Sequence, residues 1–238
     1  MTESHLADRI SSLHETLSLA EQANLKLILG LSAGQLASTS DVGAARAEVT
    51  RALDLLCPYD VANPHGLQYR GRPEFITDEL LGQLQEDAHD IASRAVPFDE
   101  HYLGYGSAAA DQLSTSPELS NFVAGLVPSA VPTGIASILY YRDAGQGISP
   151  HVDTDIFSLN ILLMLEHNYP EGIENPSALQ MHYPDGKVER VVLRPGELVV
   201  FLAGTQAHSR SPIVEGENVT ILTLGFMPEG APIENYKR

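Results

Sequence analysis

The sequence of 238 residues contains one cysteine, Cys57, and no tryptophan. A single cysteine excludes an internal disulfide and a metal site built from thiolates, so any metal must be bound through nitrogen and oxygen. The chain also lacks an apolar run of about 18 residues, so no segment is a candidate for crossing a membrane. Its first residues lack the basic and apolar regions of a secretory signal. We therefore expect a cytoplasmic protein.

Basic residues are scarce as well. The chain has 14 Lys and Arg against 31 Asp and Glu, a formal net charge of −17. Because nucleic acids and anionic membranes are attracted by basic surfaces, we expect the protein to bind neither. Net charge does not exclude a small ligand, since the charge of one pocket can oppose that of the whole chain. The length suits one domain, residues 1–238, as a monomer or homodimer that binds a small-molecule substrate.

Residues 1–130 are expected to be mostly helical, with loops that contact substrate. Apolar residues at helical spacing, together with one clear N-terminal cap signal, predict helices at 10–28, 42–56, 77–94 and 116–126. Residues 58–73 contain three prolines and two glycines, and this composition predicts an irregular loop.

The pattern changes to short apolar runs at residues 131–238. Turns rich in Gly, Pro, Asn and Asp separate them, which is typical of an all-β sandwich or barrel. The expected strands are 135–141, 157–165, 178–183, 188–193, 198–202 and 219–226. Pro184-Asp185-Gly186 predicts a hairpin between two of them. The fold class is therefore mainly β with α: a double-stranded β-helix (jelly roll) core carrying a helical N-terminal half.

Within the β-rich region, His151 and Asp153 lie two residues apart. Side chains at this spacing on a strand point to the same side. His208 follows the apolar run 198–202, a strand expected to return towards the same end of the barrel. Two imidazoles and one carboxylate can occupy one face of an octahedral metal and leave the other positions open, as in non-haem Fe(II) oxygenases. The set predicts an oxygen-activating iron enzyme with these three ligands.

Further motifs extend this prediction. Tyr141 to Asp153, with Gly145 and Pro150-His151-Val-Asp153, resembles the tyrosine–glycine and P-H-x-D signature of 2-oxoglutarate-dependent Fe(II) dioxygenases. Asp185-Gly186, the P-G-x-L-V-x-F element at residues 195–201 and the H-x-x-x-P element at residues 208–212 resemble later family elements in the same order. The resemblance covers about residues 134–228. It implies that the cosubstrates are 2-oxoglutarate and O2 and that a C–H bond of a small metabolite or natural-product intermediate is oxidised.

One position departs from the family pattern. An arginine or lysine commonly follows the second histidine by about ten residues and binds the distal carboxylate of 2-oxoglutarate, whereas this chain has Asn218. A neutral amide cannot replace a charged, bidentate guanidinium at equal strength. The anchor could be relocated to Arg210 or Arg142, ahead of Arg190 or Arg194, with hydrogen bonds from Thr220 and Tyr141. A different 2-oxoacid is the second explanation, and an oxidase similar to isopenicillin N synthase, which needs no 2-oxoacid, is the third.

Other residues are weaker candidates for ligand contacts. Asn160, within an apolar strand, is expected to face inwards and contact cosubstrate or substrate. The residues predicted to line the substrate pocket are Tyr69, Arg70, Arg72, Tyr102 and Tyr105, because arginines and tyrosines orient polar ligands in apolar pockets. His65 and His101 lie in irregular segments beside tyrosines and are lesser candidates. A cupin-like metal protein that is not an oxygenase, and a zinc hydrolase using Asp155 as a base, are the alternatives from other classes.

Overall fold

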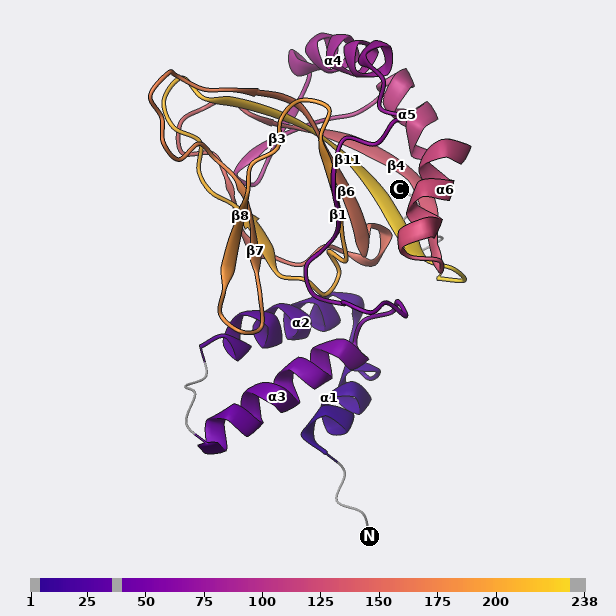
Figure 1. Ribbon diagram of the computed structural model, residues 1–238, viewed down its shortest axis with the longest axis vertical. Coiled ribbons are helices and arrows are strands. Elements are labelled where there is room, and N and C mark those ends of the chain that lie inside the picture. The colour runs from indigo at the N-terminus through magenta and orange to yellow at the C-terminus, as the bar shows by residue number, and fades with distance from the viewer. Residues whose placement is uncertain (1–4, 36–39, 232–238) are drawn as a thin grey trace.

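The computed structural model describes residues 5–35 and 40–231, without the side chains of residues 40–43 and 155. It consists of two antiparallel sheets that face each other and a set of helices at one end and on one side (Figure 1). The helices are α1 Leu6–His14, α2 Leu19–Ala33, α3 Ser40–Leu55, α4 Asp78–Ala92, α5 Ala108–Ser114 and α6 Pro117–Leu126, with a short 3-10 helix, η1, at Asp155–Phe157.

The larger sheet has seven strands in the order β1-β9-β6-β11-β4-β3-β2, and the smaller has four in the order β5-β10-β7-β8. The strands are β1 Leu67–Gly71, β2 Val96–Phe98, β3 His101–Gly104, β4 Ala130–Tyr141, β5 Ile148–His151, β6 Leu159–Asn168, β7 Leu179–His182, β8 Val188–Val191, β9 Leu198–Phe201, β10 His208–Arg210 and β11 Asn218–Pro228. From β4 onwards the chain passes back and forth between the two sheets, except that β7 and β8 form a hairpin within the smaller sheet, and this is the winding of a double-stranded β-helix.

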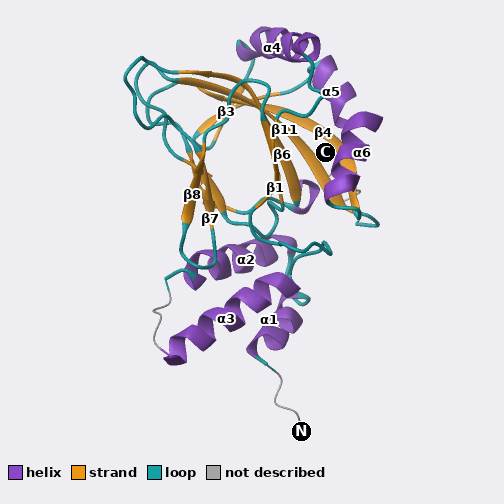
Figure 2. Ribbon diagram, viewed as in Figure 1, coloured by secondary structure: helices purple, strands orange, loops and turns teal. Residues whose placement is uncertain are grey.

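Both faces of the larger sheet are covered, which explains why its central strands are apolar throughout. On β6, Ile161, Leu163 and Leu165 pack into a core beneath the helices, while Leu162 and Met164 pack into a second core between the sheets. Successive strand residues point to opposite faces, so a strand that is buried on both sides reads as a continuous hydrophobic run. Helices α4, α5 and α6 form the outer layer (Figure 2).

Helices α1, α2 and α3 form a separate group beside the turn of the β7–β8 hairpin (Figure 1). Gly34 follows α2, and a Cβ added to it would lie 2.4 Å from the Cα of Gly186 in that turn, so the two backbones touch. A Cβ on Gly30 would lie 3.4 Å from the Cβ of Ala207, the residue before His208. The N-terminal helices therefore abut the end of the barrel that carries the metal-binding motif.

The predicted jelly roll and a largely helical N-terminal half are confirmed, with corrections in that half. The helix predicted at 10–28 is two helices, α1 and α2, separated by a turn at residues 15–18. Residues 58–73 were predicted to be an irregular loop, but residues 67–71 of this segment form β1, which pairs with β9 at the sheet edge. β2 and β3 likewise extend the other edge through pairing with β4. These strands are short and depend on long-range pairing, so no local periodicity marks them. No helix in the described residues is long and apolar enough to cross a membrane.

Candidate metal centre

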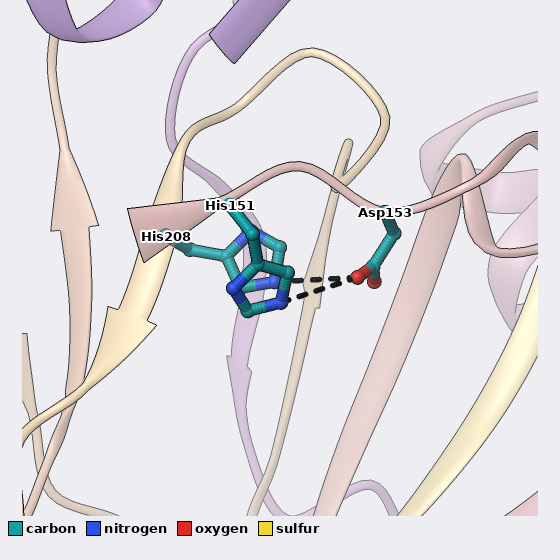
Figure 3. A group of neighbouring side chains, drawn as sticks. All are labelled: His151, Asp153 and His208. Carbon is teal, nitrogen blue, oxygen red and sulfur yellow. Dashed lines mark ion pairs between the residues drawn. The ribbon is translucent and has the colours of Figure 1, made fainter. Parts of the chain in front are cut away.

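The two histidines of the motif are held opposite each other by strand pairing. His151 ends β5 and His208 begins β10, and the antiparallel register pairs them directly. Asp153 lies just beyond β5, where its backbone N–H donates to the carbonyl of Ala203, 2.8 Å away. Figure 3 shows the three side chains converging. The carboxylate thus comes from the loop that leaves the smaller sheet, while both imidazoles come from the sheet itself.

The three side chains point their ligand atoms at a common space. Oδ1 of Asp153 lies 3.4 Å from Nε2 of His151 and 3.6 Å from Nε2 of His208. One ligand atom from each residue lies within 4.8 Å of the others. Ligand atoms at right angles around a metal, with bonds of about 2.1 Å, would lie about 3 Å apart. The spacing fits three ligands of one ion better than it fits direct, short hydrogen bonds between the side chains.

Neighbouring groups orient each ligand atom. Nδ1 of His151 donates to the carbonyl of Ser149 at 2.8 Å, and Nδ1 of His208 donates to the carbonyl of Gln206 at 3.0 Å. With the proton on Nδ1, Nε2 of each ring carries the lone pair that a metal requires. Asn160 donates from Nδ2 to Oδ2 of Asp153 at 2.7 Å, which leaves Oδ1 to face the histidines.

The protonation states of His208 and Asp153 also suit a metal. Burial lowers the pKa of His208 to about 4, so its imidazole is neutral at physiological pH. Although burial opposes it, the two histidines and Asn160 together hold the pKa of the Asp153 carboxyl below its usual value. Burial would lower the pKa of His151, but the neighbouring Asp153 carboxylate raises it overall, so in the metal-free protein a divalent ion competes with a proton for this imidazole. A neutral imidazole and an ionised carboxylate are the forms that bind divalent ions.

Beside the triad, Arg210 is buried in the interior of the barrel. It follows His208 by two residues on β10 and is 6% exposed, with its guanidinium 5.1 Å from the ring centre of Tyr141. One nitrogen, Nη2, donates to the carbonyl of Ser177 at 3.4 Å, and Nε has no hydrogen-bond partner among the described residues. Burial lowers the pKa of this guanidinium. A buried cation with so few partners leaves donors available for an anion.

Tyr141 and Asn160 also face the interior. Tyr141 packs in the core between the sheets, and burial raises the pKa of its phenol. Asn160 accepts a hydrogen bond from Thr223 at 2.7 Å through Oδ1 while it holds Asp153. The sequence predicted that Asn160 contacts cosubstrate or substrate. In the structure its amide instead donates to Asp153, one of the three candidate metal ligands. Thr223 was not predicted, although it lies on the inward side of β11 together with Ile221.

Other predicted cosubstrate residues lie on the opposite face of the larger sheet. Thr220 shares its side of β11 with Leu222, part of the core under the helices, and donates to Glu166 at 3.4 Å. Arg142 donates to the carbonyl of Ala92 at the end of α4 and stacks over the Tyr102 ring at 4.1 Å. The structure therefore brings Tyr141, Asn160 and Arg210 together with the triad and keeps Thr220 and Arg142 away from it.

The other basic residues considered as carboxylate anchors lie away from the triad. Arg190 donates to the carbonyl of Pro176 and is exposed, as is Arg194. Asn218, at the family's usual basic position, is exposed. Lys237 and Arg238, the other basic residues that follow His208 in the sequence, lie outside the described residues. Among the described residues, Arg210 is thus the buried cation that lies in the barrel interior beside the triad.

The five predicted substrate residues have partners of their own. Tyr69 packs edge-on against Phe122 of α6, and Tyr102 donates to Asp143. Arg70 donates to the carbonyl of Val192, Arg72 pairs with Asp78, and Tyr105 is 56% exposed. Within the part of the chain that the structure describes, no hydrogen bond or ring contact joins any of them to the triad. Their role in binding substrate stays a prediction.

No protein-family model matches the sequence, and no curated protein matches it. Several solved structures do share its fold. A prolyl-4-hydroxylase of Pseudomonas putida matches with a TM-score of 0.54 and 22% identity, over 70% of this chain and 94% of that one. The non-haem alpha-ketoglutarate-dependent epimerase SnoN from nogalamycin biosynthesis matches with a TM-score of 0.55 and 18% identity, over 66% of this chain and 76% of that one.

A third match is HygX from Streptomyces hygroscopicus, solved with nickel, 2-oxoglutarate and hygromycin B bound. It has a TM-score of 0.53 and 11% identity, over 67% of this chain and 82% of that one. SnoN has also been solved in complex with Fe3+, alpha-ketoglutarate and nogalamycin RO. These similarities confirm the double-stranded β-helix predicted from the sequence. The chain carries, on that fold, a His-Asp-His set with the geometry of a metal centre.

Proposed function

We propose that this protein is a non-haem Fe(II), 2-oxoglutarate-dependent oxygenase that oxidises a C–H bond of a small molecule. The observation that carries the proposal is the pairing of a His-Asp-His set, whose His208 is buried, with a buried arginine that forms no ion pair within the described residues. His151, Asp153 and His208 would hold the metal, and Arg210 would hold a carboxylate. An enzyme that needs no 2-oxoacid has no evident use for a guanidinium kept out of water at this position.

The position of Arg210 suits a ligand that also reaches the metal. β10 pairs regularly with β7, so His208 and Arg210 are consecutive residues on one side of the strand. At the usual rise of a strand their Cα atoms lie about 7 Å apart, which is close to the length of 2-oxoglutarate. A metal-chelating oxoacid head at the triad would place its distal carboxylate near the guanidinium.

When bound, Fe(II) and the 2-oxoacid supply the activation of O2, which oxidises both the 2-oxoacid and one C–H bond of the second substrate. The chain's own residues prepare the site for this chemistry. The carbonyls of Ser149 and Gln206 fix the imidazole tautomers, and Asn160 holds the carboxylate. Phe201 packs edge-on against the His208 ring at 4.8 Å and excludes water from that side. Preorganised ligands in a dry cavity are the protein's contribution in cofactor enzymes of this kind.

We further propose that the substrate is a small metabolite or natural-product intermediate. SnoN and HygX, which share the fold, have been solved with small natural products bound. A net charge of −17 disfavours nucleic acid as a substrate. The side chain of His151 is 33% exposed, against 6% for His208, so the metal is reached from the His151 side. A cytoplasmic monomer or homodimer is the expected form of the enzyme.

The test is anaerobic titration of the Fe(II)-loaded protein with 2-oxoglutarate. Chelation of Fe(II) by a 2-oxoacid gives a weak visible metal-to-ligand charge-transfer band, and we expect this band to saturate with 2-oxoglutarate. Normal iron binding without the band would contradict the proposed cosubstrate and favour the oxidase alternative. Failure to bind iron at all would favour a different metal protein, such as a zinc hydrolase, whose proposed base Asp155 has no described side chain.

A further inference from the structure

We infer that His101 is a second recognition residue for the distal carboxylate of the 2-oxoacid and acts beside Arg210 against the ring of Tyr141. This inference rests on the proposed function, and it assigns a role to a residue on β3, outside the motif-bearing strands. Its imidazole would donate a hydrogen bond to one carboxylate oxygen, while the guanidinium binds the other. Specificity for a dicarboxylic 2-oxoacid would then depend on both residues.

The first observation is that His101 is buried without a polar partner. It is 5% exposed, and neither Nδ1 nor Nε2 forms a hydrogen bond with any described residue. Buried side-chain donors and acceptors are nearly always satisfied in folded proteins, so an unsatisfied pair of atoms calls for a ligand or a bound water. Burial lowers the pKa of His101 to about 4, so the ring is neutral and offers one N–H and one lone pair.

The second observation is where the ring lies. It stacks on Tyr141, with centroids 5.4 Å apart and an interplanar angle of 24°. The Arg210 guanidinium lies 5.1 Å from the centre of the same Tyr141 ring. Two residues with unsatisfied buried nitrogens, one from each sheet, therefore contact the same phenol in the barrel interior. The inference places the carboxylate at this phenol, where its two oxygens would reach the two residues.

The third observation connects His101 to the metal-bearing strand. Glu100, the preceding residue, accepts a hydrogen bond from Oγ of Ser149 at 2.6 Å. Ser149 lies on β5, two residues before His151, and its carbonyl orients the His151 ring. The edge of the larger sheet is thereby tied to the strand that carries a metal ligand. On the outer side, Phe98 packs edge-on against His101 at 5.6 Å and shields it from water.

The test compares the wild type with His101→Phe, which retains an aromatic ring for stacking and removes both nitrogens. Anaerobic Fe(II) protein is titrated with 2-oxoglutarate and with pyruvate, which has the same chelating head and no distal carboxylate. We expect the Phe variant to bind 2-oxoglutarate about 10- to 100-fold more weakly, because it loses one hydrogen bond to a charged group. Its affinities for Fe(II) and pyruvate should change less than about twofold. His89→Phe, at an exposed position on α4, is the matched control.

The outcomes separate the two proposals. A wild type that binds Fe(II) without a charge-transfer band overturns the proposed cosubstrate and this inference together. A normal wild-type band with unchanged 2-oxoglutarate affinity in the Phe variant overturns the inference alone. Equal losses of affinity for 2-oxoglutarate, pyruvate and Fe(II) in the Phe variant also overturn the inference, because they indicate general damage to the site. If the Phe variant does not fold, His101→Ala carries the same comparison.

Discussion

Replacing Arg210 with methionine should weaken 2-oxoglutarate binding and leave the ligand-free protein at least as stable as the wild type. Methionine fills a similar volume beside Tyr141 and removes the charge. In the ligand-free protein Arg210 forms no ion pair with any described carboxylate, and its one hydrogen bond, to Ser177, is 3.4 Å long. Few interactions are therefore lost, whereas the desolvation of the guanidinium is relieved.

The two effects have opposite signs and can be estimated separately. A hydrogen bond to a charged group contributes about 1.5–3 kcal/mol, so 2-oxoglutarate affinity should fall by about 10- to 150-fold. Removing a buried charge in favour of an apolar side chain is neutral or stabilises by about 1–4 kcal/mol. In a chain of this size each kcal/mol raises the Tm by about 2–4 °C.

The assay combines thermal unfolding of the metal-free protein with the anaerobic charge-transfer titration. Arg210→Lys is the matched control, because it keeps the charge and loses the planar fork. The reasoning would be refuted by a methionine variant that unfolds several degrees earlier than the wild type and binds 2-oxoglutarate with unchanged affinity. Such a result would assign Arg210 a structural role in the barrel.

Three further predictions concern the ligands and their supports. Asp153→Ala should abolish tight Fe(II) binding and turnover, because it removes the one anionic ligand; retained turnover would take Asp153 out of the ligand set. Asn160→Ala should weaken Fe(II) binding by about 10- to 100-fold with little change in fold, the usual effect of removing a group that orients a ligand, and unchanged metal affinity by calorimetry would argue against that role. Between pH 6.5 and 5 the metal-free wild type should lose stability, because burial lowers the pKa of His101 from 6.5 to about 4 in the folded chain, so the unfolded chain takes up the proton first. In urea titrations over this range the unfolding free energy of His101→Phe should fall by about 1–2 kcal/mol less than that of the wild type. An equal fall in the two proteins would contradict the burial of a neutral imidazole.

Much of the C-terminal half could be read from local pattern. The runs that became β6, β9 and β11 are apolar because both faces of their sheet are covered, and that signal is visible in any window of the sequence. The metal ligands were found from the spacing of the His151-Val-Asp153 motif, although Asp153 lies in the loop just beyond β5 and not on the strand itself. The strands β1, β2 and β3 were missed, because they are short and form only by pairing with strands that lie far away in the sequence.

The candidate anchors show where local pattern stops. Arg142 and Arg210 both stand close to motif residues, and both were reasonable choices. Arg142 lies just beyond β4 and packs over Tyr102 on the side that faces the helices. Arg210 keeps the side of β10 that faces the barrel interior. On β10 the ligand His208 marks the inward side, and Arg210 shares it. β4, which leads to Arg142, packs apolar residues on both faces, so which of its faces is interior depends on the sheet that packs against it and not on its own residues.

The sequence by itself determined the fold class, the three metal ligands and the absence of an arginine at position 218, because each depends on residue type and spacing along one strand or motif. Only the tertiary structure decided which cation is buried beside the triad, that Asn160 holds Asp153, and that His101 meets Tyr141 and Arg210. These contacts join β3, β4, β6 and β10, which are far apart in the chain. Their side chains meet because two sheets close on each other, and no pattern within a single strand specifies that closure.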